Sequence, residues 1–205
     1  MTPASISARP TYPTLVDLLP ARTASTRLTR DLFAIVCGSA LVAASAQMAI
    51  PLPFTPVPIT GQTFAVLLVG MALGARRGAL AMLLYLLEGA AGLPVFAGGA
   101  LGLAKLLGPT AGYLLACPVA AATAGYLASR GWDRRSGTTV AAMLLSSLII
   151  LVSGALWLQF YVGGLAAAFT RGVLPFLIGD VVKASLAAAA LPSAWKLLDR
   201  DKTRS

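Results

Sequence analysis

Two charged residues, Asp180 and Lys183, stand inside the apolar stretch LPFLIGDVVKASLAAAALP at residues 174–192. They are three residues apart, so they share one face if the stretch is a helix. A charged side chain near the middle of a bilayer costs about 2.5–3.5 kcal/mol even on translocon-insertion scales. A mutual ion pair would neutralise both charges, but a leucine at either position would stabilise the helix without that penalty. We therefore expect the pair to bind a ligand or an ion.

Other residues in apolar stretches are candidates for further roles. Gln62 and Tyr85 supply hydrogen-bonding groups within predicted helices. Glu88 lies near the outer end of a predicted helix, where it could bind a ligand or simply be hydrated. Ala40 and Ala44 form a small-x-x-x-small pair, which allows a second helix to approach closely. This pair fits packing inside a bundle or docking to a separate membrane partner, and we favour docking.

The composition excludes several classes of function. The chain contains no histidine, which rules out His-based catalytic triads and His-ligated metal sites. Both cysteines, Cys37 and Cys117, lie in apolar segments, where a disulfide or a zinc site is not expected. The sequence has no G-x-x-x-x-G-K-[ST] motif and so no ATP-binding P-loop of its own. A membrane enzyme could use Lys183 as a base or nucleophile, but no motif supplies a second acid–base group. We expect no enzymatic activity, cofactor or metal.

The apolar stretches that must position these residues are those of a polytopic membrane protein. The chain is 58% hydrophobic and 11% charged, with a mean hydropathy of +0.82. Six spans are predicted, at about 31–50, 58–74, 78–91, 109–129, 138–160 and 172–195. Outside these spans, every lysine and arginine except Lys105 and Arg171 falls on the side of the two termini. This distribution of cations predicts that both termini are cytoplasmic. The net charge of +9 therefore reflects membrane topology and does not indicate nucleic-acid binding.

The predicted fold is all-α: a bundle of six transmembrane helices with both termini cytoplasmic. We expect a flexible N-terminal tail at residues 1–30, a substrate-binding membrane domain at 31–196 and a basic C-terminal tail at 197–205.

Three predicted outward loops are rich in proline or glycine and carry aromatic residues. Their sequences are PLPFTPVP at 51–58, GLPVFAGG at 92–99 and FYVGG at 160–164. Non-helical backbone near a membrane persists only where protein buries it or where it lines a cavity. The loops could be ordinary surface turns, but together they favour a capped, outward-facing pocket. Phe96 and Gly98, in the second loop, are its candidate residues.

Three motifs, in this order and spacing, strongly resemble the BioY family. They are PFTPVPITGQTFAVLLVGMALGARRGALAMLLYLLEGAAGLPVFAGG, GPTAGYLLA and PFLIGDVVKASLAAA, within a likeness that covers about residues 30–195. Ala111 stands where the family more often has glycine, a small change. The family comprises the biotin-specific substrate-binding membrane components, or S-components, of energy-coupling factor (ECF) transporters.

The resemblance implies high-affinity capture of biotin and its uptake across the cytoplasmic membrane of a prokaryote. It also implies two kinds of partner, a transmembrane coupling protein and cytoplasmic ATPase subunits. Biotin has two ureido N–H donors, a ureido carbonyl and a carboxylate tail, so it could offer each charge of the Asp180–Lys183 pair a further partner. Either end of biotin could face the pair. The alternative is an ion-coupled carrier for another small organic anion or vitamin, with Asp180 as the coupling site.

Overall fold

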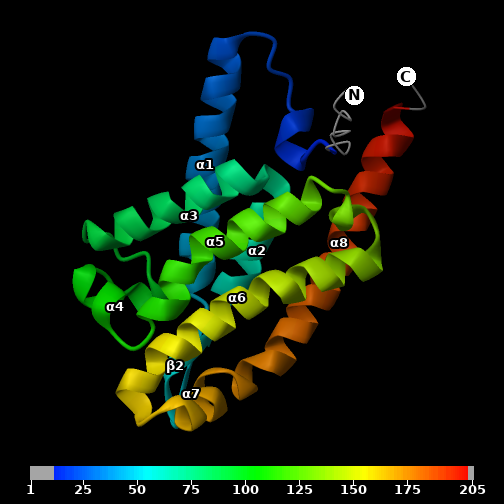
Figure 1. Cartoon of the computed structure of the whole chain (residues 1–205). Helices are drawn as coiled ribbons and strands as arrows, with labels where there is room; N and C mark the ends of the chain where they lie inside the picture. Colours follow the sequence, from blue (N-terminus) through cyan, green and yellow to red (C-terminus); the bar gives the residue numbers. More distant parts are fainter. Residues whose placement is uncertain (1–11, 203–205) are drawn as a thin grey trace, which may run out of the picture.

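The structure is a computed structural model that describes residues 12–202, with side chains described as far as residue 198. Its helices and strands are arranged as in Figure 1. In chain order the elements are η1 (Leu15–Leu18), α1 (Ala24–Ala46), β1 (Ala49–Leu52), β2 (Thr55–Thr60), α2 (Gln62–Leu73), α3 (Ala75–Ala90), η2 (Ala97–Gly99), α4 (Leu103–Leu107), α5 (Ala111–Ala128), η3 (Trp132–Arg134), α6 (Ser136–Val162), α7 (Leu165–Gly172) and α8 (Leu174–Lys202).

The predicted helical bundle is confirmed. The six expected helices correspond to α1, α2, α3, α5, α6 and α8, while the short helices α4 and α7 were not expected. Within the described residues, four helical stretches are long and apolar enough to cross a membrane: α1, α5, α6 and the stretch from α7 through α8. α2 has 12 residues and α3 has 16. At 1.5 Å per residue they extend about 18 and 24 Å, less than the roughly 30 Å of a hydrocarbon core.

Helical structure extends beyond both expected domain boundaries. α1 begins at Ala24, before the boundary at residue 31, because Thr23 and Thr26 cap its N-terminus reciprocally. The Thr23 hydroxyl accepts from the Thr26 backbone N–H at 3.2 Å, and the Thr26 hydroxyl accepts from the Thr23 N–H at 3.0 Å. α8 likewise continues past residue 196 to Lys202. Residues 1–11 and 203–205 of the two expected tails lie outside the described residues.

A β-hairpin replaces the extended loop expected at residues 51–58. β1 and β2 pair antiparallel, with Ala49 opposite Thr60 and Ile50 opposite Ile59. The prolines of this segment are compatible with a two-stranded sheet because both strands are edge strands, where a missing N–H leaves no ladder bond broken. β2 leads directly into α2, so the hairpin fixes the entrance of the chain into the bundle.

The helix α5 forms the centre of the bundle, since it packs against α2, α3 and α6. Two glycines allow this close packing. A Cβ at Gly70 of α2 would lie 2.4 Å from the carbonyl oxygen of Ala121, and a Cβ at Gly125 of α5 would lie 2.3 Å from the carbonyl carbon of Gly74. Both distances are shorter than any real contact, so a larger residue would force the helices apart.

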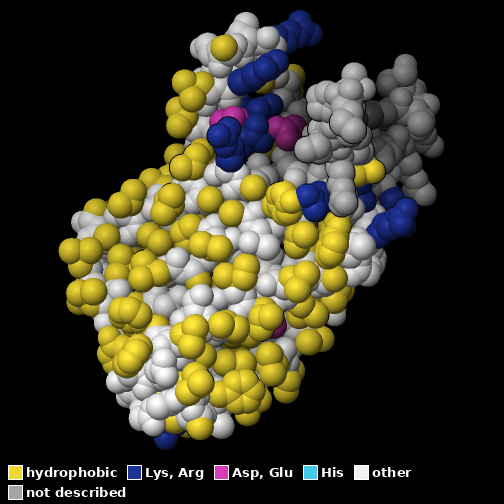
Figure 2. Space-filling model, in the orientation of Figure 1, with side chains coloured by type: hydrophobic (Ala, Val, Ile, Leu, Met, Phe, Trp, Pro, Cys, Tyr) yellow, Lys and Arg dark blue, Asp and Glu magenta, His cyan; other side chains and the backbone are white. Residues whose placement is uncertain are grey.

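Charged and apolar side chains occupy different parts of the surface. In Figure 2, lysine and arginine side chains gather at the end of the molecule near the two termini, whereas hydrophobic side chains cover most of the remaining visible face. Exposed large apolar residues occur on every long helix, for example Phe33 (69% exposed) on α1 and Ile178 (77%) on α8. An apolar outer surface of this extent is that of a protein surrounded by lipid.

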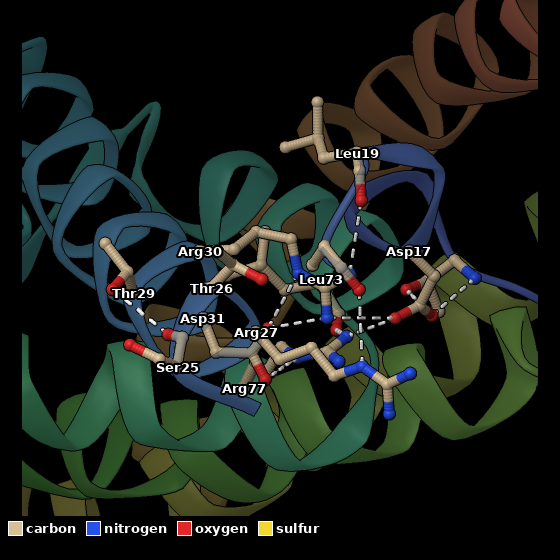
Figure 3. A network of polar contacts seen from close by, with 12 residues as sticks. Asp17, Leu19, Ser25, Thr26, Arg27, Thr29, Arg30, Asp31, Leu73 and Arg77 are labelled. Atoms are coloured by element: carbon tan, nitrogen blue, oxygen red, sulfur yellow. Dashed lines mark hydrogen bonds and ion pairs between the residues drawn. The ribbon is translucent and has the colours of Figure 1, made fainter. Parts of the chain in front are cut away.

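An ion-pair network joins η1, α1 and α3 at the end near the termini (Figure 3). It comprises Asp17, Arg30, Asp31 and Arg77, and we call it the terminal network. Arg77 bridges Asp17 at 2.8 Å and Asp31 at 3.0 Å, and Arg30 binds Asp31 at 2.8 Å. The backbone N–H and hydroxyl of Thr14 donate to the other Asp17 oxygen at 3.0 and 2.7 Å. Each of the four carboxylate oxygens therefore has a close partner.

A stacked cluster joins the two ends of the chain at the same end of the bundle. The guanidinium of Arg134 lies 4.9 Å from the ring centroid of Tyr12 and 4.0 Å from that of Trp195. The Trp195 indole N–H donates to a carboxylate oxygen of the buried Asp133 at 2.6 Å. Residue 12, the connection between α5 and α6, and α8 are thus held together.

Candidate substrate-binding site

A cavity opens among the elements far from the termini, where Figure 1 places β2, α4 and α7. Its wall is formed by β2, the start of α2, the segment 96–97, α4, and inward faces of α5, α6 and α8. Most of the lining is apolar. The polar and charged side chains that line it are those of Thr60, Gln62, Thr63, Lys105, Thr110, Tyr113, Asp180 and Lys183. A mostly apolar cavity with a few convergent polar groups is the usual form of a small-molecule site.

Asp180 and Lys183 line this cavity and are held by neighbouring helices. The Asp180 side chain is only 7% exposed, and one of its carboxylate oxygens accepts a short hydrogen bond from the Ser147 hydroxyl of α6. The Lys183 ammonium donates to the Thr63 hydroxyl of α2 at 2.6 Å. The lysine nitrogen and the second Asp180 oxygen are 3.8 Å apart. This distance allows attraction but is too long for a hydrogen bond, so both groups retain hydrogen-bonding capacity.

The pair lies nearer one end of its helix than expected. The sequence placed the two charges around the middle of a span at 172–195. α8 in fact begins at Leu174 and continues to Lys202, so Asp180 falls within its first third. At 1.5 Å per residue, Asp180 and Lys183 are about 9 and 14 Å from the start of α8. Both charges line the cavity from this first part of α8.

Gln62, Tyr85 and Phe96 form one connected group. The Gln62 amide donates to the Tyr85 hydroxyl at 3.1 Å, and that hydroxyl donates to the backbone carbonyl of Val95 at 3.1 Å. The rings of Tyr85 and Phe96 meet edge to face, with centroids 5.5 Å apart. Gln62 and Phe96 line the cavity, whereas Tyr85 lies behind them. The geometry thus makes Tyr85 a support for the wall.

Gly98 is exposed and does not line the cavity, although the segment that carries it does. Its φ of +68° lies in the left-handed region, which a side chain would strain. In this turn the Gly99 N–H donates to the Phe96 carbonyl at 3.0 Å. The Phe96 N–H donates to the Ala100 carbonyl, also at 3.0 Å. Phe96 is fully buried, packed against Gly89. Gly98 therefore shapes the turn that directs Phe96 inward.

The polar side chains of the site that were not predicted from the sequence are Thr60, Thr63, Lys105, Thr110, Tyr113 and Ser147. Ser147 and Thr63 hold the charged pair, while Lys105 of α4 and Thr110 line the cavity on their own. Hydroxyl residues are common in membrane helices, where they usually bond to their own backbone, so sequence gives little reason to single these out. Lys105 did carry a signal, because it is one of the two cations that depart from the charge asymmetry of the loops.

The remaining candidates lie outside the cavity. Ala40 and Ala44 are exposed on the outer face of α1. The neighbouring Gly38 is buried instead, and a Cβ there would come 2.9 Å from Val69. Glu88 is half-buried and accepts a hydrogen bond from the fully buried Ser39 of α1 at 2.5 Å. The outer face of α1 thus presents the alanines to the membrane, while Glu88 links α3 to α1.

Comparisons with known proteins agree with this architecture. A model of the BioY family matches residues 16–200. The chain is 43% identical over 148 residues to a probable biotin transporter BioY of Pyrococcus horikoshii, an alignment covering 72% of this chain and 85% of that protein. It is 40% identical over 169 residues to the biotin transporter BioY of Rhizobium etli, covering 78% and 90% of the two chains.

A solved structure has the same fold. It is the crystal structure of the S-component for biotin from an ECF-type ABC transporter, with a TM-score of 0.74 and 27% identity over 86% of this chain and 95% of that chain. The predicted resemblance is therefore confirmed: the chain belongs to the BioY family.

Proposed function

We propose that this protein captures biotin and acts as the biotin-binding S-component of an ECF-type ABC transporter in the cytoplasmic membrane of a prokaryote. One observation carries the proposal beyond the names of the relatives. The buried Asp180 and the partly buried Lys183 line one cavity, 3.8 Å apart, and each retains hydrogen-bonding capacity. Buried charges left in this arrangement are costly unless a ligand completes their hydrogen bonds.

Biotin has the chemistry that such a cavity requires. Its bicyclic ring with a thioether sulfur suits the apolar wall that Leu114, Ile150 and Phe176 contribute. Its ureido group carries N–H donors and a carbonyl acceptor side by side. The free Asp180 oxygen can accept from such a donor, and the Lys183 ammonium can donate to such an acceptor.

Uptake requires partners, and two features favour them. The sequence has no P-loop, so energy from ATP must come from separate subunits. Ala40 and Ala44 lie exposed on α1, where their small side chains would let a helix of a coupling protein approach closely. We propose a transmembrane coupling protein on this face and cytoplasmic ATPase subunits attached to it.

The charge distribution supports an orientation with both termini in the cytoplasm and the cavity facing outward. Cysteine labelling tests it in a chain in which Cys37 and Cys117 are replaced by serine. A cysteine at position 137 should resist an impermeant thiol reagent applied to intact cells, because it would lie inside. A cysteine at the exposed position 101 should react, and the reverse pattern would overturn the orientation.

The function is tested by calorimetric titration of the purified full-length protein without nucleotide. We expect biotin to bind one-to-one and tightly, and thiamine and riboflavin not to compete. Folded protein that ignores biotin but binds another vitamin would contradict the proposal. Uptake that survives ATP depletion and collapses with the proton gradient would instead favour the ion-coupled carrier.

A further inference from the structure

A groove lies beside the terminal network, at the end of the molecule opposite the cavity. It has a volume of about 1060 Å³ and is lined by residues from segment 12–17, from 28–31 of α1 and from 73–80, where α2 gives way to α3, together with Ser129. We call it the terminal groove. Figure 1 shows the N-terminal half of α1 standing away from the other long helices. The groove is therefore reached from the outer surface of the protein.

The terminal groove carries one positive charge that the described chain does not balance. Asp17, Asp31 and Arg77 line it as members of the terminal network. Arg30, which binds Asp31, brings that network to two cations and two anions. Arg76 also lines the groove, is exposed, and forms no ion pair with any carboxylate that the structure describes. An anion would therefore be attracted to the groove at Arg76.

The rest of the terminal groove is partly apolar and continues into the apolar outer surface. Leu28 of α1 and Leu80 of α3 line the groove, yet they are 62% and 50% exposed. The exposed residues of α3 follow one face of that helix at intervals of four, three and four: Arg76, Leu80, Leu83 and Leu87. A cation at the end of an exposed apolar face is typical of a helix that passes from the headgroup layer into the hydrocarbon.

The cation and the apolar face also adjoin at the scale of the whole molecule. In Figure 2 the lysine and arginine side chains at this end border the hydrophobic surface directly. A ligand that fits such a boundary has an anionic head and an apolar tail. Basic pockets between membrane helices commonly take the headgroup of an anionic lipid, and arginine matches phosphate oxygens with bidentate hydrogen bonds.

We propose that the terminal groove binds an anionic phospholipid, with the phosphate at the Arg76 guanidinium and the first part of an acyl chain against Leu28 and Leu80. The lipid would fill the space between the outward part of α1 and the start of α3. A small anion would leave the apolar side of the groove uncovered, whereas a zwitterionic lipid would leave the charge of Arg76 unbalanced. This site is separate from the cavity and does not depend on biotin.

The test measures lipid binding to the purified full-length protein in mild detergent by native mass spectrometry. Phosphatidylglycerol is compared with phosphatidylcholine that has the same acyl chains. Wild type should bind the first phosphatidylglycerol more tightly by about three- to ten-fold in Kd, a modest preference because the arginine is exposed and its charge is screened. Arg76→Gln should bring the two Kd values together.

Matched variants identify the cause of any change. Arg135→Gln removes an exposed cation at the same end of the molecule but outside the terminal groove, and it should keep the preference. Leu80→Ser should weaken both lipids alike, because it removes an apolar contact and leaves the charge in place. Biotin binding should be unchanged in all three variants, since none of these residues lines the cavity, and it also shows that each variant is folded.

Three results would overturn the proposal. The first is that wild type binds the two lipids equally, or that Arg76→Gln retains the preference. The second is an equal loss in Arg76→Gln and Arg135→Gln, which would assign the preference to the surface charge as a whole. The third is that excess inorganic phosphate or glycerol phosphate, at constant ionic strength, displaces phosphatidylglycerol. That result would assign the groove to a small anion.

Discussion

Two clusters of charged residues in this protein, the terminal network and the Asp180–Lys183 pair, differ in how their hydrogen bonds are completed. In the terminal network every carboxylate oxygen has a donor between 2.7 and 3.0 Å away. In the cavity the charges of Asp180 and Lys183 stand 3.8 Å apart, and the hydroxyl of Thr110 has no partner in the described chain. Groups that satisfy one another hold a fold together, whereas groups with spare hydrogen-bonding capacity that line a cavity fit a ligand.

The environment of the two regions explains why this contrast is tolerated. The terminal network is partly exposed, with side chains that retain between 14% and 34% of their accessibility, so water can complete any missing bond. In the cavity, Asp180 is 7% exposed, so water reaches it far less, whereas Lys183, at 20%, is as exposed as the terminal network. Burial of the Asp180 carboxylate is therefore costly, and a hydrogen-bonding ligand would offset part of that cost.

The largest effect should follow from breaking the cavity pair. Asp180→Ala removes an acceptor for the ligand and leaves Lys183 buried without its counter-charge, so we expect affinity for biotin to fall by about 3–5 kcal/mol. Asp180→Asn keeps the shape and should also bind weakly. Glu88→Ala, which disrupts a bond to Ser39 outside the cavity, is the matched carboxylate control. The site assignment fails if Asp180→Ala and wild type give the same Kd by titration.

Replacing an exposed alanine of α1 separates binding from transport. Ala40→Trp would hold a partner helix several ångströms away, so uptake should be lost in cells that contain the coupling module. Biotin binding by the purified variant should be unchanged, because the residue is exposed and outside the cavity. Ala190→Trp, on an exposed part of α8, should affect neither. If Ala40→Trp loses both biotin binding and thermal stability, this face of α1 packs inside the bundle and is not a docking surface.

A smaller effect is expected from disturbing the wall. In Gly89→Ala the new Cβ would lie 2.1 Å from the ring of Phe96, which must therefore move. Overpacking of this kind typically costs about 1–3 kcal/mol, and we expect both stability and biotin affinity to fall. Gly137→Ala, where a Cβ meets nothing within 4 Å, is the control. Unchanged affinity in Gly89→Ala would show that the position of Phe96 does not matter for binding.

The smallest effect should come from the terminal network. Burial opposes ionisation of Asp17, but hydrogen bonds from Thr14 and the charge of Arg77 outweigh it and hold the pKa of Asp17 below its usual value. Arg77→Met should lower thermal stability near neutral pH by about 1 kcal/mol, since the ion pairs are partly exposed. Biotin affinity should not change, because Arg77 is outside the cavity.

The lowered pKa of Asp17 also predicts how the effect of Arg77→Met on stability changes with pH. A depressed pKa means that ionised Asp17 stabilises the fold fully above its unfolded pKa of about 3.9. That contribution disappears as the pH falls through the lower pKa of the folded state. The stability difference between wild type and Arg77→Met should therefore shrink below about pH 4. A difference that stays constant down to pH 3 would show that Asp17 does not contribute through its charge.

The sequence predicted those parts of the structure that interrupt an otherwise apolar pattern. Asp180 and Lys183 were found because charges stand out in a membrane helix, and the positions of the helices followed from hydropathy. The early start of α1 was missed because residues 24–30 are polar, and its cap uses threonine at both positions. Apolar runs and the alternation of basic loops predicted six spans, of which α2 and α3 prove to be short helices.

Partners across helices were beyond the reach of sequence reasoning. Ser147 and Thr63 resemble Thr123 and Ser185, whose hydroxyls bond carbonyls of their own helices. Only the packing of α2 and α6 against α8 turns the first two toward the charged pair. The same holds for Thr110, because only the packing of the helices buries its hydroxyl without a partner among the described residues.

The contrast between the two regions is tested most directly by the shift in Tm that biotin produces. A ligand present at 100 times its Kd stabilises the folded state by about 2.7 kcal/mol. The account predicts a clear upward shift for wild type, an equal shift from a slightly lower starting point for Arg77→Met, and almost none for Asp180→Asn at the same biotin concentration. A full shift in Asp180→Asn, or a lost shift in Arg77→Met, would contradict it.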